Sequence, residues 1–246
     1  MEFRRPAQNA ARPNNFILAN LPDEEFARLS RSMTRVNLPL GFQFFTPGMV
    51  VQHIFFPTAG VVSTTAVTEA GEIVEIGMTG NDGLVGALTV LGQPESVHAM
   101  GMQVAGEGYR VKASAAQDLM KDCSCFTDLV YKHIALQMQQ MGQSALCNRL
   151  HDVKARLARW LLTASDRNNS ERLGLTQEFL SQMLGSRRST VTVMAGELQR
   201  DGMIEYSRGR ILITNREALE KVACECYGIV TAAYKKMLQG EEAVVV

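Results

Sequence analysis

The chain has 246 residues, enough for one large domain or two ordinary ones. Apolar residues make up 46% and charged residues 20%, which predicts a folded globular protein and excludes a disordered one. The formal net charge is zero, which excludes a uniformly basic surface but not a basic patch. Residues 149–216 carry twelve basic against seven acidic side chains, so we expect an anionic partner there.

The N-terminal residues 1–15 are rich in Pro, Asn and Ala and are expected to be a flexible lead-in. Their arginines are not followed by the apolar stretch of a signal peptide. No run approaches the roughly 18–20 apolar residues that a bilayer crossing needs. We therefore expect a cytoplasmic protein with reduced cysteines and no membrane partner.

Short strands are expected after a first helix. Residues 22–35 predict that helix, because acidic residues occupy its first turn and basic residues its last. From 36 to 112, β-branched and aromatic runs alternate with turn signals such as PTAG, EAG and TGNDG. This spacing is typical of an antiparallel barrel or sandwich, with a hairpin around residues 69–71.

Apolar residues from Phe126 to Ala145 recur every three or four positions, which predicts one long helix. Either this helix lies on the barrel or it forms a coiled-coil-like dimer seam. Its Gln-rich flanks favour the dimer. The expected seam consists of Val130, Ile134, Met138, Met141 and Ala145.

The five cysteines include two CxC pairs, at 123/125 and 224/226, about a hundred residues apart. A closed zinc site usually shows two CxxC-type knuckles or nearby histidines. Two residues apart on a helix, Cys224 and Cys226 would point in different directions. We therefore expect structural thiols, with no metal and no cofactor.

The next segments follow the order of a helix-turn-helix unit. Residues 150–165 predict a helix with Trp160 in the core. Thr176 is an expected N-cap for a short helix over 177–184, Gly185 ends it, and Ser186 is expected to cap a second helix over 187–200. This order, and the strand–turn–strand pattern of 203–215, predict a winged helix-turn-helix.

In this motif the first turns of the second helix enter the DNA major groove. An arginine there can pair with guanine O6 and N7. Positive charge opposes the helix dipole at an N-terminus, so the adjacent arginines call for an anionic partner, and double-stranded DNA is predicted. The expected base-reading residues are Arg187, Arg188, Ser189 and Thr192, and the hairpin places Arg208 and Arg210 for phosphates.

The order of barrel, long helix and winged helix resembles the Crp/Fnr family of bacterial transcription regulators over about residues 16–216. The most specific segment is LTQEFLSQMLGSRRSTVTVMAGELQRDGMIEYSRGRILI, and HIFFPTAGVVSTTAV resembles the family's cyclic-nucleotide-binding-type jelly roll. The resemblance implies an α+β chain with an antiparallel β jelly roll (16–122), a dimerisation helix (123–149) and a C-terminal winged helix-turn-helix (150–246).

The same resemblance implies particular DNA contacts. Arg188 matches the family's principal base-reading arginine, whereas Ser189 stands where many members have a base-contacting glutamate. The recognised half-site is therefore expected to differ. Backbone phosphate contacts are implied for Thr176, Gln177 and Thr190.

The sensor cassette departs from the family's cyclic-nucleotide binders, in which a glutamate holds the ribose and an arginine the phosphate. Gly86 is kept, but Ala87 replaces the glutamate, and Val97 and His98 stand where Arg-Ser would be. Residues 83–109 contain no Lys or Arg. Because a buried phosphate without a cation is costly, cAMP is not expected to bind.

The sequence thus predicts a homodimeric, sequence-specific DNA-binding regulator without enzymatic activity, acting on palindromic operators. RNA polymerase and an unidentified small-molecule effector are further candidate partners. One alternative is a regulator that responds to a cyclic nucleotide or another small ligand through a non-standard pocket. Another is a cupin-like metal enzyme, against which the four scattered histidines argue.

Overall fold

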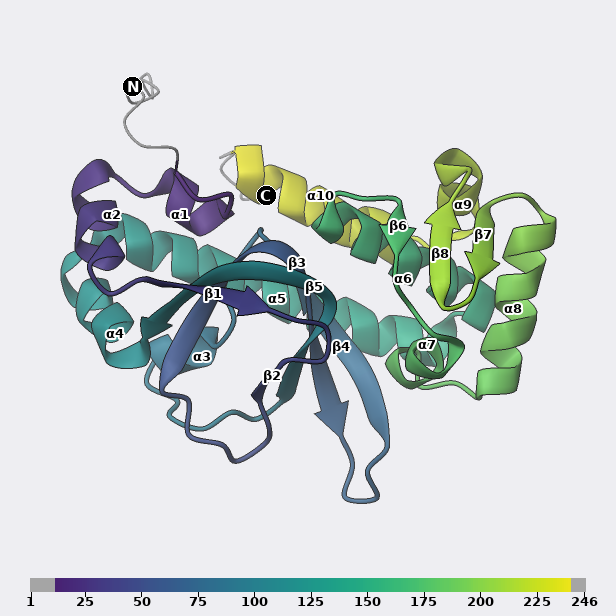
Figure 1. Cartoon of the computed structure of the whole chain (residues 1–246), viewed down its shortest axis with the longest axis horizontal. Coiled ribbons are helices and arrows are strands. Elements are labelled where there is room, and N and C mark those ends of the chain that lie inside the picture. The colour runs from purple at the N-terminus through teal and green to yellow at the C-terminus, as the bar shows by residue number, and fades with distance from the viewer. Residues whose placement is uncertain (1–11, 240–246) are drawn as a thin grey trace.

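A computed structural model describes residues 12–239, in which a long helix runs from an N-terminal β domain to a C-terminal helical unit with a small sheet (Figure 1). The predicted α+β fold class is confirmed. The first half contains α1 (Phe16–Asn20), α2 (Asp23–Ser30), β1 (Thr34–Leu38), β2 (Gln43–Phe45), β3 (His53–Val67), β4 (Ile73–Thr79), α3 (Ala87–Val90), β5 (Ala99–Lys112), α4 (Ala113–Asp122) and α5 (Ser124–Leu150).

The second half contains shorter elements around α6. None of the helices described over residues 12–239 combines the length and apolar character of a membrane span. These elements are α6 (Val153–Asn168), β6 (Arg172–Leu173), α7 (Gln177–Met183), α8 (Arg188–Arg200), β7 (Ile204–Ser207), β8 (Arg210–Ile213), α9 (Arg216–Val222) and α10 (Cys226–Gln239).

The N-terminal sheet is antiparallel, in the order β1-β5-β3-β4, with β2 also paired to β5. Strands β3 and β4 form the predicted hairpin, in which the Thr68 N–H donates to Glu72 O at 2.9 Å. Gly71 takes a φ of +84°, a conformation that glycine adopts without steric cost. Apolar side chains such as Phe44, Phe55 and Val62 fill the interior of this domain.

Two expectations for the N-terminal segment are wrong in part. The first helix ends at Ser30 rather than at residue 35, because Thr34 to Leu38 pair with β5 as strand β1. The flexible lead-in expected over 1–15 does not reach Asn15, which is buried, caps α1 and donates to Gly83 O at 2.7 Å. Residues 1–11 lie outside the described part of the chain.

The long helix is confirmed, but its first turns pack on its own β domain. Phe126 and Val130 are completely buried there, so Val130 cannot belong to a dimer seam. His133 is also buried, with Nε2 2.9 Å from Leu84 O, and its ring occupies the space that a Cβ on Gly83 would need. Burial lowers the pKa of His133, which keeps this anchoring imidazole neutral.

The C-terminal unit has a core of its own, built on α6. Trp160 is 1% exposed and packs edge-on against Phe179 of α7, with ring centroids 6.2 Å apart, so the core position predicted for Trp160 is confirmed. The Arg156 guanidinium of α6 donates to the carbonyl of Leu184, directly after α7. This contact satisfies a carbonyl at the end of α7 and fixes the turn that follows.

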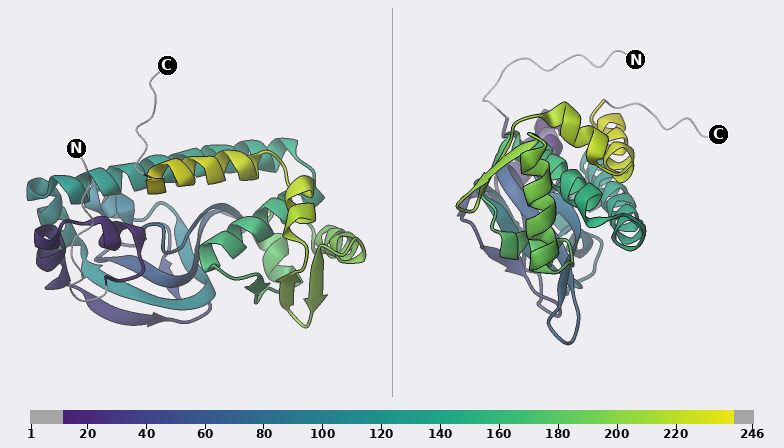
Figure 2. Two further views of the ribbon diagram at one scale, coloured as in Figure 1. Left: turned by 90° about the horizontal axis from the view of Figure 1, so that it is seen from above. Right: turned by 90° about the vertical axis from the view of Figure 1, so that its right-hand side faces the viewer.

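Helix α10 leaves this unit and runs back along α5, in the opposite direction (Figure 2). Val230 and Tyr234 of α10 pack on Leu136, in the middle of α5. Cys226 begins α10, but Cys224 lies in the connection that follows α9. The expectation that these two cysteines point apart on one helix is therefore wrong.

Candidate nucleic-acid interface

The predicted helix-turn-helix is present as α7 and α8. The Thr176 side chain caps α7 by accepting from the Phe179 N–H at 3.1 Å, as predicted. Gly185 takes a φ of +54° in the turn. Ser186 is not the cap of the second helix: its hydroxyl donates to Leu184 O at 3.3 Å, and α8 begins at Arg188. Arg187 therefore lies just before the helix, at the N-cap position, without a capping hydrogen bond of its side chain.

Helix α8 has one buried and one exposed face. Val191, Ala195 and Leu198 are the buried side chains, each at most 1% exposed. The opposite face presents the residues predicted to read bases, together with one exposed apolar side chain: Arg187, Arg188, Ser189, Thr192 and Val193. The structure thus brings the four predicted base readers to one surface.

Two of the predicted DNA contacts already have partners within the chain. The Thr192 hydroxyl donates to Gln177 Oε1 at 2.8 Å, which joins the start of α7 to α8. Arg188 Nη1 lies 3.6 Å from Glu178 Oε2, and both side chains are more than half exposed. The arginines at the start of α8 were expected to need an anionic neighbour from DNA, and Glu178 already provides one. Such an exposed pair is weak and opens easily.

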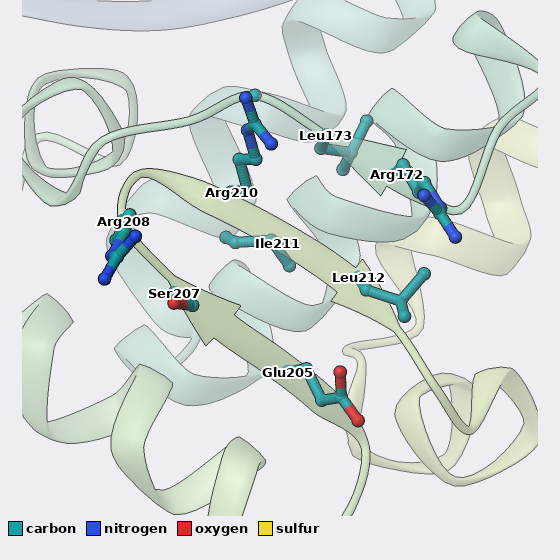
Figure 3. A pocket seen from close by; sticks show the side chains of 9 residues that line it. Arg172, Leu173, Glu205, Ser207, Arg208, Arg210, Ile211 and Leu212 are labelled. Carbon is teal, nitrogen blue, oxygen red and sulfur yellow. The ribbon is translucent and has the colours of Figure 1, made fainter.

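The wing is a three-stranded sheet in the order β6-β8-β7 (Figure 3). Ser207 pairs with Arg210 across a two-residue turn, in which Arg208 (φ +49°) and Gly209 (φ +74°) both have positive φ. This is the backbone of a type I′ hairpin. Arg208 stands at its tip and Arg210 follows on β8.

Arg172 is a basic residue of this surface that the sequence did not single out. It lies on β6, which pairs with β8 through Arg172 and Leu212, and it lines one concave surface with Arg208 and Arg210 (Figure 3). Local sequence shows only a polar segment there, since the pairing of a two-residue strand depends on the rest of the wing. Three arginines from three segments thus line this surface of the wing, together with one acidic residue, Glu205.

A cavity of about 140 Å³ lies between the β domain and α5, at the positions of the sensor cassette. It is lined by Gly86, Ala87, Val97 and His98, and by Ile134, Met138 and Met141 of α5. Of the described residues that line it, none is lysine or arginine. Burial lowers the pKa of His98, which disfavours the one imidazolium that this cavity could offer.

Comparisons with known proteins agree with this geometry. The family model of the Crp-like helix-turn-helix domain matches residues 155–222. By sequence, none of the curated proteins matches this chain. Among solved structures, FixK2 from Bradyrhizobium japonicum is similar with a TM-score of 0.67 and 14% identity, over 78% of this chain and 98% of that chain.

Two other solved structures show the same fold. A protein assigned to the Crp/Fnr family, from Eubacterium rectale, has a TM-score of 0.66 and 16% identity over 82% of this chain and 95% of that one. The c-di-GMP-responsive global regulator CLP from Xanthomonas campestris has a TM-score of 0.65 and 16% identity over 78% and 99%.

These findings define a DNA-binding class of protein by its domain and its fold. Residues 155–222 are a Crp-like helix-turn-helix domain, and 78–82% of the chain shares its fold with these solved structures. The C-terminal part of the chain is therefore a DNA-binding domain of the Crp-like helix-turn-helix type.

Proposed function

We propose that the chain is a homodimeric regulator that binds palindromic operators, with α8 in the major groove and the wing on the flanking backbone. The observation that carries this proposal is the exposed face of α8, which presents Arg187, Arg188, Ser189 and Thr192 together. The proposed units are a β domain over 16–122, a dimerisation helix over 123–149 and a winged helix-turn-helix from 150. RNA polymerase is a further candidate partner.

Arg188 is the proposed principal base reader, because it begins α8 and its guanidinium is held by a weak, exposed pair with Glu178. Arg187 is proposed to contact a phosphate or a second base. Ser189 cannot accept from cytosine N4 as a carboxylate does, and the exposed Val193 offers methyl groups that suit a thymine methyl. These two residues are proposed to set the operator apart from those of relatives.

Phosphate contacts are proposed for the start of α7, for α8 and for the wing. Thr176, Gln177 and Thr190 flank the reading face, whereas Arg208 and Arg210, joined by Arg172, carry positive charge along the wing. Such contacts position the protein on DNA and supply salt-dependent affinity without reading sequence.

Replacing Arg188 by alanine should weaken binding to the operator about 10- to 100-fold, since a bidentate arginine–guanine contact is worth about 1–3 kcal/mol. Binding to a random duplex should change much less, so that discrimination at one base pair is lost. The measurement is a fluorescence anisotropy titration at fixed salt with both duplexes, the operator being selected from random sequence by the parent protein.

The control for this experiment is Arg31→Ala, which removes one positive charge from an exposed position just after α2. That variant should bind both duplexes as the parent does. Equal affinities of Arg188→Ala and the parent for the operator would show that Arg188 does not read a base.

Dimerisation is proposed through an exposed stripe on α5 that differs from the seam expected from sequence. The buried Val130 is excluded, and Ile134 is half-buried against the β domain. The exposed positions at spacings of four and three are Tyr131, Ala135, Met138, Gly142 and Ala145. This is the a/d spacing of a coiled coil, and its small residues allow a second α5 to approach closely.

Changing Met138 to glutamate should convert the dimer to monomers, because Met138 is 69% exposed at the centre of the stripe and a partner helix would bury the new charge. Sedimentation velocity at micromolar concentration measures the result. Leu40→Glu is the matched control, since Leu40 is 64% exposed on the β domain. A Met138→Glu variant that sediments as a dimer like the parent would show that this stripe is not the dimer interface.

The effector is proposed to be something other than cAMP or cGMP. The 140 Å³ cavity is smaller than the roughly 300–1,000 Å³ of typical ligand sites and offers no cation for a phosphate. The Xanthomonas regulator responds to c-di-GMP, whose phosphates would meet the same lack of positive charge here. Because Glu95 also lines the cavity, we propose a small ligand without negative charge.

A further inference from the structure

Four metal-ligating side chains converge where α5 ends. Cys147 and His151 come from the last turn of α5 and the residue that follows it, and Cys224 and Cys226 come from the connection between α9 and α10. Their sulfur and nitrogen atoms all lie within 4.8 Å of one another. The Cys147 and Cys224 sulfurs are 3.5 Å apart, and Cys226 Sγ is 3.4 Å from His151 Nδ1.

The chain brings these groups together through two different local geometries. His151 follows Cys147 by four residues, and its N–H donates to Cys147 O at 3.2 Å, so it stands one turn beyond Cys147 although its own backbone is extended. Ala223 has extended backbone after α9 (φ −63°, ψ 146°), so Cys224 precedes α10 and Cys226 starts it. The CxC segment can therefore turn both thiols toward α5, which a continuous helix would not allow.

The donor set and its spacing select a kind of metal ion. Three thiols and one imidazole are a donor set of structural zinc sites. Zinc–sulfur bonds of about 2.3 Å in a tetrahedron place neighbouring sulfurs about 3.8 Å apart, close to the separations found here. Ligands to the separate irons of an iron–sulfur cluster would stand farther from one another, so the spacing fits a single ion.

The surroundings also resemble those of a metal site. The Gln143 side-chain amide donates to Cys226 Sγ at 3.1 Å, and His151 Nε2 lies 3.1 Å from Glu225 Oε1. A carboxylate on the outer nitrogen of a ligating histidine orients the ring and increases its basicity. Nδ1, which faces Cys226, is left for the metal. All three thiols are buried.

We infer that Cys147, His151, Cys224 and Cys226 bind one Zn²⁺ ion per chain. The ion would join the last turn of α5 to the first turn of α10, next to the break at which α5 gives way to α6. It would thereby fix the junction between the dimerisation helix and the DNA-binding unit, a consequence that rests on the proposed function. Metal binding itself does not depend on that function.

The test is a Co²⁺ titration of the full chain, prepared metal-free with a chelator under reducing conditions. The parent should bind one Co²⁺ per chain, with the thiolate charge-transfer absorption and the intense visible bands of tetrahedral cobalt, and one equivalent of Zn²⁺ should abolish them. Cys224→Ser and His151→Ala should each weaken Co²⁺ binding at least tenfold, because each removes one of four ligands.

The matched control is Cys125→Ser, which alters the other CxC pair and should leave the cobalt spectrum unchanged. The inference is overturned if the reduced parent shows no tetrahedral cobalt bands, which would leave Cys147 and Cys224 as a thiol pair able to form a disulfide. Equal Co²⁺ affinity in Cys224→Ser, His151→Ala and the parent would overturn it as well. Because no DNA is present, either failure leaves the proposed function standing.

Discussion

Replacing Arg167 by alanine should lower the free energy of unfolding by about 3–5 kcal/mol, the usual cost of removing one partner of a buried ion pair. Arg167 Nε lies 3.3 Å from Asp82 Oδ2, and the two side chains are only 8% and 13% exposed. The same nitrogen donates to Met78 O at 3.3 Å. Without the guanidinium, the Asp82 carboxylate stays in a largely buried place and loses its ion-pair partner.

The expected loss is large because Arg167 links three parts of the fold. It belongs to α6, Asp82 follows β4 in the β domain, and the guanidinium carbon lies 4.3 Å from the ring centre of Tyr234 on α10. A cation over a buried aromatic ring adds a further favourable term. The substitution should therefore loosen the contacts of α10 and of the β domain with α6 together.

Urea unfolding at pH 7, followed by circular dichroism, measures this change. Arg31→Ala is the control and should stay within about 0.5 kcal/mol of the parent, as surface substitutions usually do. The double variant Asp82→Asn/Arg167→Met should lose less stability than Arg167→Ala, because it leaves no buried charge unpaired. A loss below about 1 kcal/mol in Arg167→Ala would contradict the buried-pair interpretation.

The second large effect concerns pH and Glu75. This residue lies on β4, is 7% exposed, and faces Met183 of α7 across Ser63 and Gln103. Burial raises the pKa of Glu75 to about 7, although Gln103 and Ser63 donate hydrogen bonds that favour the charged form and Arg159 is nearby. The folded protein therefore holds a proton on this carboxyl at pH values where the unfolded chain has released it.

The raised pKa fixes the sign of the pH dependence. The contribution of Glu75 to the free energy of unfolding is fully present below its ordinary pKa of 4.5 and is lost as the pH rises toward about 7. Above that pH the contribution no longer changes. At about 1.4 kcal/mol per unit, the loss across this window is about 3 kcal/mol. Glu75→Gln should remove it, because the amide does not titrate.

Urea unfolding of the parent and Glu75→Gln between pH 5 and 8.5 provides the comparison. The difference in unfolding free energy between the two proteins should change by about 2–3 kcal/mol across this range and level off above pH 7.5. Glu69→Gln, at an exposed position of the β3–β4 hairpin, should follow the parent throughout. A constant difference between Glu75→Gln and the parent would show that Glu75 does not titrate in this window.

Much of the DNA-binding unit could be predicted from the sequence because its signals are local. The Thr176 cap, the turn at Gly185 and the strand–turn–strand of the wing each depend on residues within a few positions of one another. Local errors were correspondingly small: Ser186 is not a cap, and α8 starts one residue late. The β3–β4 hairpin was predictable for the same reason.

Features that depend on the packing of distant segments could not be predicted from the sequence. Periodicity shows that α5 is apolar at Val130 and Met138, but not that the β domain buries the first and leaves the second exposed. The order of residues gives no sign that Arg172 pairs with the wing or that Glu75 is enclosed by α7. These environments exist only when the segments are placed against each other.

The cysteines show this division most clearly. By itself, the sequence determined that Cys147 lies in a long helix and that Cys224 and Cys226 form a CxC segment far from it in the chain. Only the tertiary structure decided that Cys224 precedes α10 and that both CxC thiols reach the end of α5, about 75 residues away in the chain. Helical periodicity is fixed by neighbouring residues, whereas the meeting of two distant segments is fixed by the packing of the whole core.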